Sequence, residues 1–331
     1  MSHSTLHDIA NRVGVTPVTV SRVLSGTYKA KRAGALKRAE QIRQVAAELG
    51  YRVNVHARAM RHGRLGNIAL VMSKDPARSL LHERELNALH DALLDEQLNL
   101  VIARLDDKTL ESEADLPRVL TEYAVDGVLI NYKKNIPPML EMLIERHRIP
   151  AVWIARKRKH DATYYAYRNS IKKAVREQIN AGHRRIAMVF KLNPDHQPTD
   201  HYSETDPLAG YEKAMLDAGL KPQCLQVRWD VDELSQLTTL LSAKNHPSFL
   251  MTRDQQTLLP ILAAAYHVGL KLPDDLQIML IGHGTTLIPA VDFKHLRYDY
   301  ERLAQTAVKL LVEKIKAPDQ PIQSKPIPLC W

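Results

Sequence analysis

Short apolar segments alternate with amphipathic stretches from residue 67 onward, and this alternation restricts the fold more than any other feature. Apolar strands of this length, each followed by a helix, are typical of parallel sheets covered on both faces. Strands are expected over 67–72, 99–103, 126–131 and 150–154 and, in a second series, over 185–190, 225–228, 248–251 and 277–281. Helices are expected over 80–96, 112–123, 137–147, 170–181, 208–218, 232–242, 255–268 and 300–316. The prediction is an α/β core of two lobes with parallel doubly wound sheets.

The two lobes are expected to enclose a cleft at the carboxyl ends of their strands, where open α/β sheets bind ligands. The helix over 300–316 is expected to return to the first lobe. The Pro-rich segment KPIPLCW at 325–331 is expected to add a terminal strand.

The residues before this core form a second, all-α pattern. A helix is expected over 5–13, where Ser4 or Thr5 is the N-cap and Asp8 has capping-box spacing from Thr5. Gly14 supplies the left-handed residue that ends this helix and opens a tight turn. A second helix begins with Thr16 as its N-cap and Pro17 at its first position. Proline lacks an N–H group, but at this position an N–H would have no hydrogen-bond acceptor within the helix. The pattern predicts a helix-turn-helix.

The outward face of the second helix is expected to contact DNA. Val20, Val23 and Leu24 point inward, so Pro17, Val18, Ser21 and Arg22 face outward near the helix start. A recognition helix places this part in the major groove. Arg22 is expected to bind a guanine edge, and Pro17 and Val18 are expected to offer apolar contact, for instance to a thymine methyl. The remaining residues expected at the DNA, largely as phosphate contacts, are Thr5, Thr16, Thr19 and Ser21. The alternative is an ordinary helical pair with a solvated basic face.

A third helix is expected over about 33–49 and ends at Gly50. Its inward residues repeat at helical spacing, and they are Ala35, Leu36, Ala39, Ile42, Val45, Ala46 and Leu49. The loop before it carries Tyr28, Lys29, Lys31 and Arg32, which are expected to contact backbone phosphates unless they form only a solvated charge run.

Charge divides the chain at the same place as the folding pattern. Residues 1–64 hold 12 Lys and Arg against 3 Asp and Glu, out of 46 and 37 in the whole chain, so the remainder is balanced. A basic head on a neutral body is typical of a domain that meets a polyanion.

Several function classes find no support in the sequence. It has no apolar run near the ~18 residues that span a bilayer and no apolar signal core at its start, which favours a cytoplasmic, nucleoid-associated protein. Cys224 and Cys330 form no CxxC pair and are expected to be reduced. P-loop, GxSxG and HExxH motifs and metal-ligand spacings are absent, so we expect no enzyme activity, no metal and no cofactor.

The motifs resemble those of one known family. TLHDIANRVGVTPVTVSRVLSG at 5–26 is similar to the head of the lactose/galactose repressor (LacI/GalR) family of transcription regulators, and ELGYRVNVHARAMRHG at 48–63 is similar to that family's third-helix end and hinge. GHRRIAMV at 182–189 and LPDDLQIMLIG at 272–282 match its body. The resemblance implies a DNA-binding head over 1–52, a hinge over 53–64 and a two-lobed body over 65–331. That body resembles a periplasmic sugar-binding protein, which dimerises and holds an effector.

The resemblance also assigns roles to the hinge. In the family this segment becomes helical on operator DNA, and a pair of apolar side chains enters the minor groove at the dyad. Carried over, the hinge contacts are Asn54, His56, Ala57 and Met60, with Met60 as the wedge. Val53 stands where the family often has proline. From the residues alone, 54–64 is equally consistent with a short basic linker helix.

The cleft departs from the family at four positions. At these positions the family has polar residues that bind sugar hydroxyls, and this chain has Ala166, Pro207, Arg253 and the pair His283-Gly284 instead, although Asp254 is kept. Each lost hydrogen-bond partner weakens a hydroxyl-rich ligand by about 1–3 kcal/mol. The expected effector contacts are Trp153, Tyr165, Tyr167, Trp229, Arg253, Asp254 and His283. The family implies a sugar or sugar derivative, whereas these aromatic and cationic groups favour an anionic or aromatic ligand. For each of these seven residues, the alternative is a position in the packed core or on the surface without a ligand contact.

The function predicted is a sequence-specific regulator, with repression as the expected direction. It is expected to bind a pseudo-palindromic, double-stranded operator as a homodimer, under control of a small molecule. One alternative is a DNA-binding repressor whose core responds to no ligand. Another, from a different class, is an enzyme or solute carrier built on the α/β body, for which catalytic motifs and a signal peptide are missing.

Overall fold

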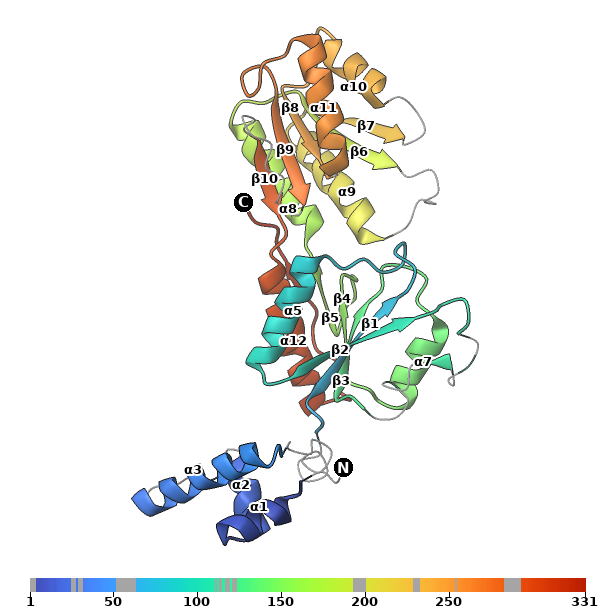
Figure 1. Cartoon of the computed structure of the whole chain (residues 1–331). Coiled ribbons are helices and arrows are strands. Elements are labelled where there is room, and N and C mark those ends of the chain that lie inside the picture. The colour runs from blue at the N-terminus through green and yellow to red at the C-terminus, as the bar shows by residue number, and fades with distance from the viewer. Residues whose placement is uncertain are drawn as a thin grey trace. The chain divides into compact units, whose positions relative to one another are not determined.

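The computed structural model describes residues 4–24, 28, 32–51, 64–110, 112, 115–116, 120, 124–192, 201–228, 233–253, 255–282 and 293–331. The chain divides into two compact units, Met1–Leu65 and Gly66–Trp331 (Figure 1). This division falls one residue from the predicted start of the body.

The first unit is a three-helix head of α1 (Leu6–Val13), α2 (Pro17–Leu24) and α3 (Ala33–Glu48). Its core consists of Ile9, Ala10, Val20, Val23, Ala39, Ile42, Val45 and Ala46, and those from α2 and α3 are among the inward residues that the helical spacing predicted. Two members of the predicted stripe, both in the first turn of α3, lie outside this core: Leu36 is 57% exposed and Ala35 is half-buried.

The second unit begins with a six-stranded parallel sheet in the order β11-β5-β4-β3-β1-β2. Its strands are β1 (Asn67–Ser73), β2 (Asn99–Leu105), β3 (Gly127–Asn131), β4 (Ala151–Ile154), β5 (Ala162–Tyr165) and β11 (Lys325–Ile327). Ile68 and Leu70 pack with α5 (Glu83–Asp95) and α12 (Tyr300–Lys316). Ala69 and Val71 face the opposite side, toward α7 (Pro138–Arg146). Both faces are therefore buried, which explains the continuous apolar runs.

The second lobe has the same construction, with a parallel sheet in the order β10-β9-β8-β6-β7. Its strands are β6 (Ile186–Leu192), β7 (Gln223–Arg228), β8 (Phe249–Thr252), β9 (Gln277–Gly282) and β10 (Lys294–Arg297). Along β9, Met279 and Ile281 pack toward α8 (Tyr167–Asn180) and α9 (Tyr202–Asp217). Ile278 and Leu280 pack toward α10 (Glu233–Ser242) and α11 (Gln255–Val268). Each helix pair thus covers one face of the sheet.

Three segments connect the lobes. The chain leaves the first lobe between β5 and α8, returns between β10 and α12, and ends with β11 followed by a bridge from Cys330 to Arg297. The N–H of Ala166 donates to the carbonyl of Ile327 at 2.7 Å, and the N–H of Leu329 donates to Ser170 Oγ at 3.0 Å. The predicted return of the helix over 300–316 and the terminal strand are confirmed.

The structure differs from the expected elements in three places. β5 and β10 were not predicted, because each is four residues long and lacks a continuous apolar run. Helix α9 begins at Tyr202 rather than 208, with Pro207 inside it. Pro207 is the sixth residue of that helix and removes a single backbone hydrogen bond, so the helix passes through it. Most of the helix expected over 112–123 lies outside the described residues.

Helices α8 and α9 cross unusually closely at Gly210. A Cβ built on Gly210 would lie 2.4 Å from the carbonyl oxygen of Arg168, a distance that no side chain tolerates. Glycine therefore allows the two backbones to meet, and it brings the charged residues of both helices onto one surface.

Candidate DNA-binding head and interlobe site

The turn between α1 and α2 has the geometry that the sequence predicted. Gly14 has φ +72°, and the N–H groups of Gly14 and Val15 both donate to the carbonyl of Ala10, at 2.9 and 3.0 Å. Thr16 Oγ1 accepts from the N–H of Thr19 at 3.3 Å, and Pro17 is the first residue of α2. These contacts fix the angle between the helices of the pair.

The outward face of α2 carries the predicted contact residues. Val18 is 59% exposed and Arg22 is exposed, whereas Pro17, Thr19 and Ser21 are half-buried. Since Val20 and Val23 are fully buried, Val18 and Arg22 are held on the opposite side of α2. An apolar and a cationic group thus project from the first two turns.

Two of the predicted DNA ligands, Thr5 and Thr16, also cap helices. The Thr5 hydroxyl and N–H both donate to the Asp8 carboxylate, at 2.8 and 2.7 Å, and these hydrogen bonds lower the pKa of Asp8. Thr16 Oγ1 lies 3.0 Å from Thr19 Oγ1. Any contact that these threonines make with DNA is therefore added to a structural role.

The remaining predicted DNA ligands divide into described and undescribed residues. Arg32 is exposed before α3, whereas Tyr28 is half-buried against the head core and its N–H donates to the Arg22 carbonyl at 3.0 Å. Tyr28 therefore holds α2 through its contact with the head core and its backbone hydrogen bond to Arg22. The predicted ligands Lys29, Lys31, Asn54, His56, Ala57 and Met60 lie outside the described residues.

In the body, five tyrosines gather where the segments cross between the lobes. Tyr165 and Tyr298 have ring centroids 4.7 Å apart, and Tyr167 lies 5.6 Å from Tyr202 and 6.0 Å from Tyr298. Tyr300 completes the group at 5.9 Å from Tyr298. The sequence indicated only Tyr165 and Tyr167. The other three come from distant segments that meet only in the folded chain.

Two polar atoms in this region are buried without a hydrogen-bond partner among the described residues. They are the hydroxyl of Tyr165 and Nε of Arg253. The guanidinium of Arg253 lies over the Tyr167 ring, 5.5 Å from its centroid. Because an unpaired buried donor is costly, both atoms are available to a ligand or a water molecule at this point.

Charged groups lie beside the tyrosines from both lobes. Burial raises the pKa of Glu85 to about 7, although nearby Lys133 opposes the shift. Burial lowers the pKa of Lys133, Glu85 raises it, and the positive charge of Arg253 lowers it further. Lys133 follows β3 in the first lobe and Arg253 follows β8 in the second. Two cations therefore approach each other across the lobes.

Direct contacts also join the lobes. Lys157 Nζ lies 2.8 Å from Asp206 Oδ2, and His201 Nε2 donates to the Ala155 carbonyl at 3.0 Å. His201 Nδ1 accepts from the N–H of Ser203 at 3.3 Å. Burial is the main cause that lowers the pKa of His201 to about 4, so the ring is neutral at pH 7 with its proton on Nε2.

Among the other predicted effector ligands, Trp153 is described and does not join this group. Trp153 is buried in β4, packs in the first-lobe core with Val128 and Ala151, and has the Arg158 guanidinium 4.3 Å from its ring centroid. Trp229, Asp254 and His283 lie outside the described residues.

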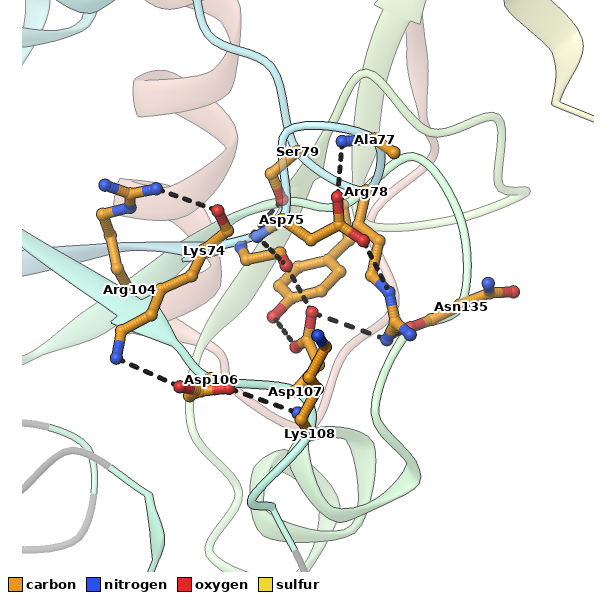
Figure 2. Close-up of polar contacts among 12 residues, drawn as sticks. Lys74, Asp75, Ala77, Arg78, Ser79, Arg104, Asp106, Asp107, Lys108 and Asn135 are labelled. Atoms are coloured by element: carbon orange, nitrogen blue, oxygen red, sulfur yellow. Dashed lines mark hydrogen bonds and ion pairs between the residues drawn. The ribbon is translucent and has the colours of Figure 1, made fainter. Parts of the chain in front are cut away.

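A polar network holds the segment that follows β1 (Figure 2). The side chain of Asp107 is only 4% exposed, and it accepts hydrogen bonds from the Ser73 hydroxyl and from Tyr132 OH, the latter at 2.7 Å. Arg78 Nη1 lies 3.5 Å from the same carboxylate. Asp107 thereby joins the ends of β1, β2 and β3 and fixes the chain that leads into α5 and Glu85.

Clustered metal ligands and membrane-spanning helices are both absent from the described part of the chain. It holds no group of three or more His, Cys, Asp or Glu side chains that would bind a metal ion. No helix there has the length and apolar character needed to cross a membrane.

Comparisons with known proteins agree with this architecture. Residues 5–54 match the family described as bacterial regulatory proteins, lacI family, and residues 175–330 match the periplasmic binding protein-like domain. The HTH-type transcriptional repressor PurR of Escherichia coli O1:K1 / APEC is 26% identical over 327 residues, which cover 94% of this chain and 90% of PurR.

Solved structures share the fold along the whole chain. The lac repressor dimer bound to operator and the anti-inducer ONPF gives a TM-score of 0.71 at 19% identity, covering 99% of this chain and 97% of that chain. The complex of transcriptional regulator CelR with cellobiose gives 0.59 at 20% identity, covering 99% and 98%. The predicted arrangement of a helix-turn-helix head on a two-lobed core is confirmed.

Proposed function

We propose that this chain is a DNA-binding transcriptional repressor of the lacI family of bacterial regulatory proteins, as its match to that family over residues 5–54 and its similarity to PurR support, and that it acts as a homodimer on a pseudo-palindromic, double-stranded operator. The observation that carries the proposal is α2, which begins at Pro17 and presents Val18 and Arg22 from its first two turns. Arg22 recognises a guanine in the major groove, and Val18 offers apolar contact. The hinge over 53–64 bends the dyad, with Met60 as the wedge.

The site of action follows from the same proposal. The protein works at chromosomal operators in the cytoplasm. It binds ligands rather than catalysing a reaction, which is supported by its similarity to PurR, a protein named as a transcriptional repressor.

The dimer contact is proposed on the outer face of α11. Leu259 and Tyr266 are 65% and 87% exposed, and Leu262 lies between them at helical spacing. Exposed apolar stripes of this kind mark protein interfaces. The partner is a second copy of the chain, because two heads are needed to contact both halves of a palindrome.

Replacing Leu259 and Tyr266 together by lysine is expected to produce monomers in sedimentation velocity. Operator affinity should fall at least about 100-fold, because each head then binds its half-site alone. Met142→Lys, at a 59% exposed apolar position on α7, is the matched control and should leave both properties unchanged. A double variant that stays dimeric would exclude α11 as the contact.

The interlobe site is proposed to bind a small anionic effector. Lys133 and Arg253 belong to opposite lobes, and Arg253 is near enough for its charge to lower the pKa of Lys133. The buried Tyr165 hydroxyl and Arg253 Nε lack partners among the described residues. An anion between the two cations holds the lobes together and so favours one of their arrangements. Effector control requires that the ligand bind the two lobe arrangements with different affinity.

Thermal melting with sugars, sugar acids, sugar phosphates and nucleosides tests this class of ligand. A bound ligand at about 100 times its dissociation constant adds ~2.7 kcal/mol to the free energy of unfolding. We expect shifts with the acids or phosphates, and their loss in Arg253→Met. Shifts confined to neutral sugars would contradict an anionic effector, and no shift at all would favour the alternative of an unresponsive core.

A further inference from the structure

A hollow runs along the outer side of α8 in the second lobe. Its larger part, of about 460 Å³, is lined by residues of α8 that include Lys172, Lys173 and Arg176. A smaller part, of about 270 Å³, shares Asn169 and Lys173 with the first and continues it toward the end of the chain. The two parts form one surface, which we name the α8 groove.

The larger part of the α8 groove carries excess positive charge. Lys172 Nζ and Arg176 Nη2 lie 3.1 and 2.9 Å from Asp217 Oδ2, and Lys213 Nζ contacts the other oxygen of the same carboxylate. Hydrogen bonds from Lys213 and Lys172 hold the pKa of Asp217 well below its usual value. One carboxylate cannot neutralise three cations, so the cluster attracts further negative charge.

Lys173 adds to this excess. Its side chain is 76% exposed, and its ion-pair partner, Glu177, is 3.9 Å away. An exposed pair at this distance contributes little to stability, so Lys173 can exchange Glu177 for an acidic group of a partner at small cost.

The smaller part of the α8 groove is apolar. It is lined by Leu296, Pro328, Leu329 and Trp331, and the tryptophan is 44% exposed. Arg297 Nη2 donates to the carbonyl of Trp331, which fixes the backbone that carries the ring. An exposed aromatic residue beside a hollow is a typical anchor point at protein interfaces.

We propose that the α8 groove docks an acidic segment of a partner protein, whose carboxylates meet Lys173 and Arg176 and whose apolar side chain enters the hollow beside Trp331. A nucleic acid would satisfy the cations alone, whereas a peptide with carboxylates near an apolar residue satisfies both parts. Charge complementarity therefore selects the acidic peptide.

The position of the α8 groove connects docking to regulation. Its apolar part includes Ala166 and Leu329, which belong to two of the three segments that connect the lobes. A segment bound there touches the junction from outside, at a place separate from Lys133 and Arg253. Docking of a partner protein therefore gives this chain a second means of regulation, which does not depend on a ligand between the lobes.

The test uses the full chain and fluorescein-labelled peptides of about twelve residues with several Asp and Glu around one Leu or Trp. Fluorescence anisotropy should show binding that is about tenfold weaker or more for the double variant Lys173→Glu, Arg176→Glu. The double variant Lys244→Glu, Lys271→Glu reverses the same number of charges at exposed lysines of the same lobe and should bind as the unmodified chain does. Equal loss in both double variants would overturn the proposal, and so would no binding.

Two further variants separate the parts of the α8 groove. Asp217→Asn should tighten binding several-fold, because Lys172, Arg176 and Lys213 lose their carboxylate. Trp331→Ala should weaken only peptides that contain the apolar residue. Non-operator duplex DNA provides the last comparison: if the Lys173, Arg176 double variant loses DNA affinity as much as peptide affinity, the partner is nucleic acid and the proposal fails.

Discussion

Replacing Arg22 by alanine is expected to weaken the operator complex by about 5- to 150-fold, while binding to random DNA changes by less than about threefold. A bidentate contact from arginine to guanine contributes roughly 1–3 kcal/mol of base discrimination. Random sequence offers few such contacts and is bound mainly through phosphates. Arg22 is exposed on α2 opposite the buried Val20 and Val23, so the substitution leaves the head core intact.

Titrations of both DNAs at one salt concentration measure this ratio. Arg43→Ala is the matched control, because Arg43 is an exposed arginine of the head that pairs with Glu40 on α3. It should leave the ratio unchanged. Equal losses on operator and random DNA in Arg22→Ala would show that Arg22 binds phosphate and recognises no base.

The second large effect is expected from Glu85 and depends on pH. The carboxyl has a pKa of about 7 in the folded chain against a usual value of 4.5, because it is buried. Between these values the folded state holds a proton that the unfolded state has lost. The free energy of unfolding therefore falls as the pH rises from about 4.5 to about 7, by about 3 kcal/mol in total.

Glu85→Gln should remove this dependence. The amide resembles the protonated acid, so the variant should match the unmodified chain at pH 4 and exceed its stability at pH 8. The difference between the two proteins isolates Glu85, because His82 and His201 titrate in both. Glu83→Gln, at an exposed position of α5, is the control. A variant that is less stable than the unmodified chain at pH 8 would contradict the account of Glu85.

The head was predictable because its signals are local. Gly14, Thr16 and Pro17 each determine a backbone conformation or a cap within a few residues, and the apolar spacing determines which faces meet. The same holds for the eight core strands that were predicted in the two series, whose apolar runs are typical of parallel sheets covered on both faces.

The interlobe site was only partly predictable because its residues come from separate segments. Tyr202, Tyr298 and Tyr300 meet Tyr165 through tertiary packing that no spacing indicates. Glu85 had a usable signal: it lies three and four residues before Ala88 and Leu89, on the buried side of α5. An acidic residue on an apolar helix face is unusual enough to suggest a special environment.

The Asp107 network and the α8 groove had no comparable signal. Ser73 ends β1, whereas Asp107 and Tyr132 follow β2 and β3, and only the order of the strands in the sheet brings the three residues together. Asp217 meets Lys172 and Arg176 because Gly210 lets α9 approach α8, a contact that depends on a missing side chain.

Selection of binding sites from random duplex DNA with the full chain tests the central claim most directly. Sequencing the bound fraction should yield one enriched pseudo-palindrome, whose symmetric half-sites each carry a guanine that requires Arg22, with two chains bound per duplex. A bound fraction without an enriched sequence, or a single half-site bound by one chain, would contradict a dimeric, sequence-specific repressor.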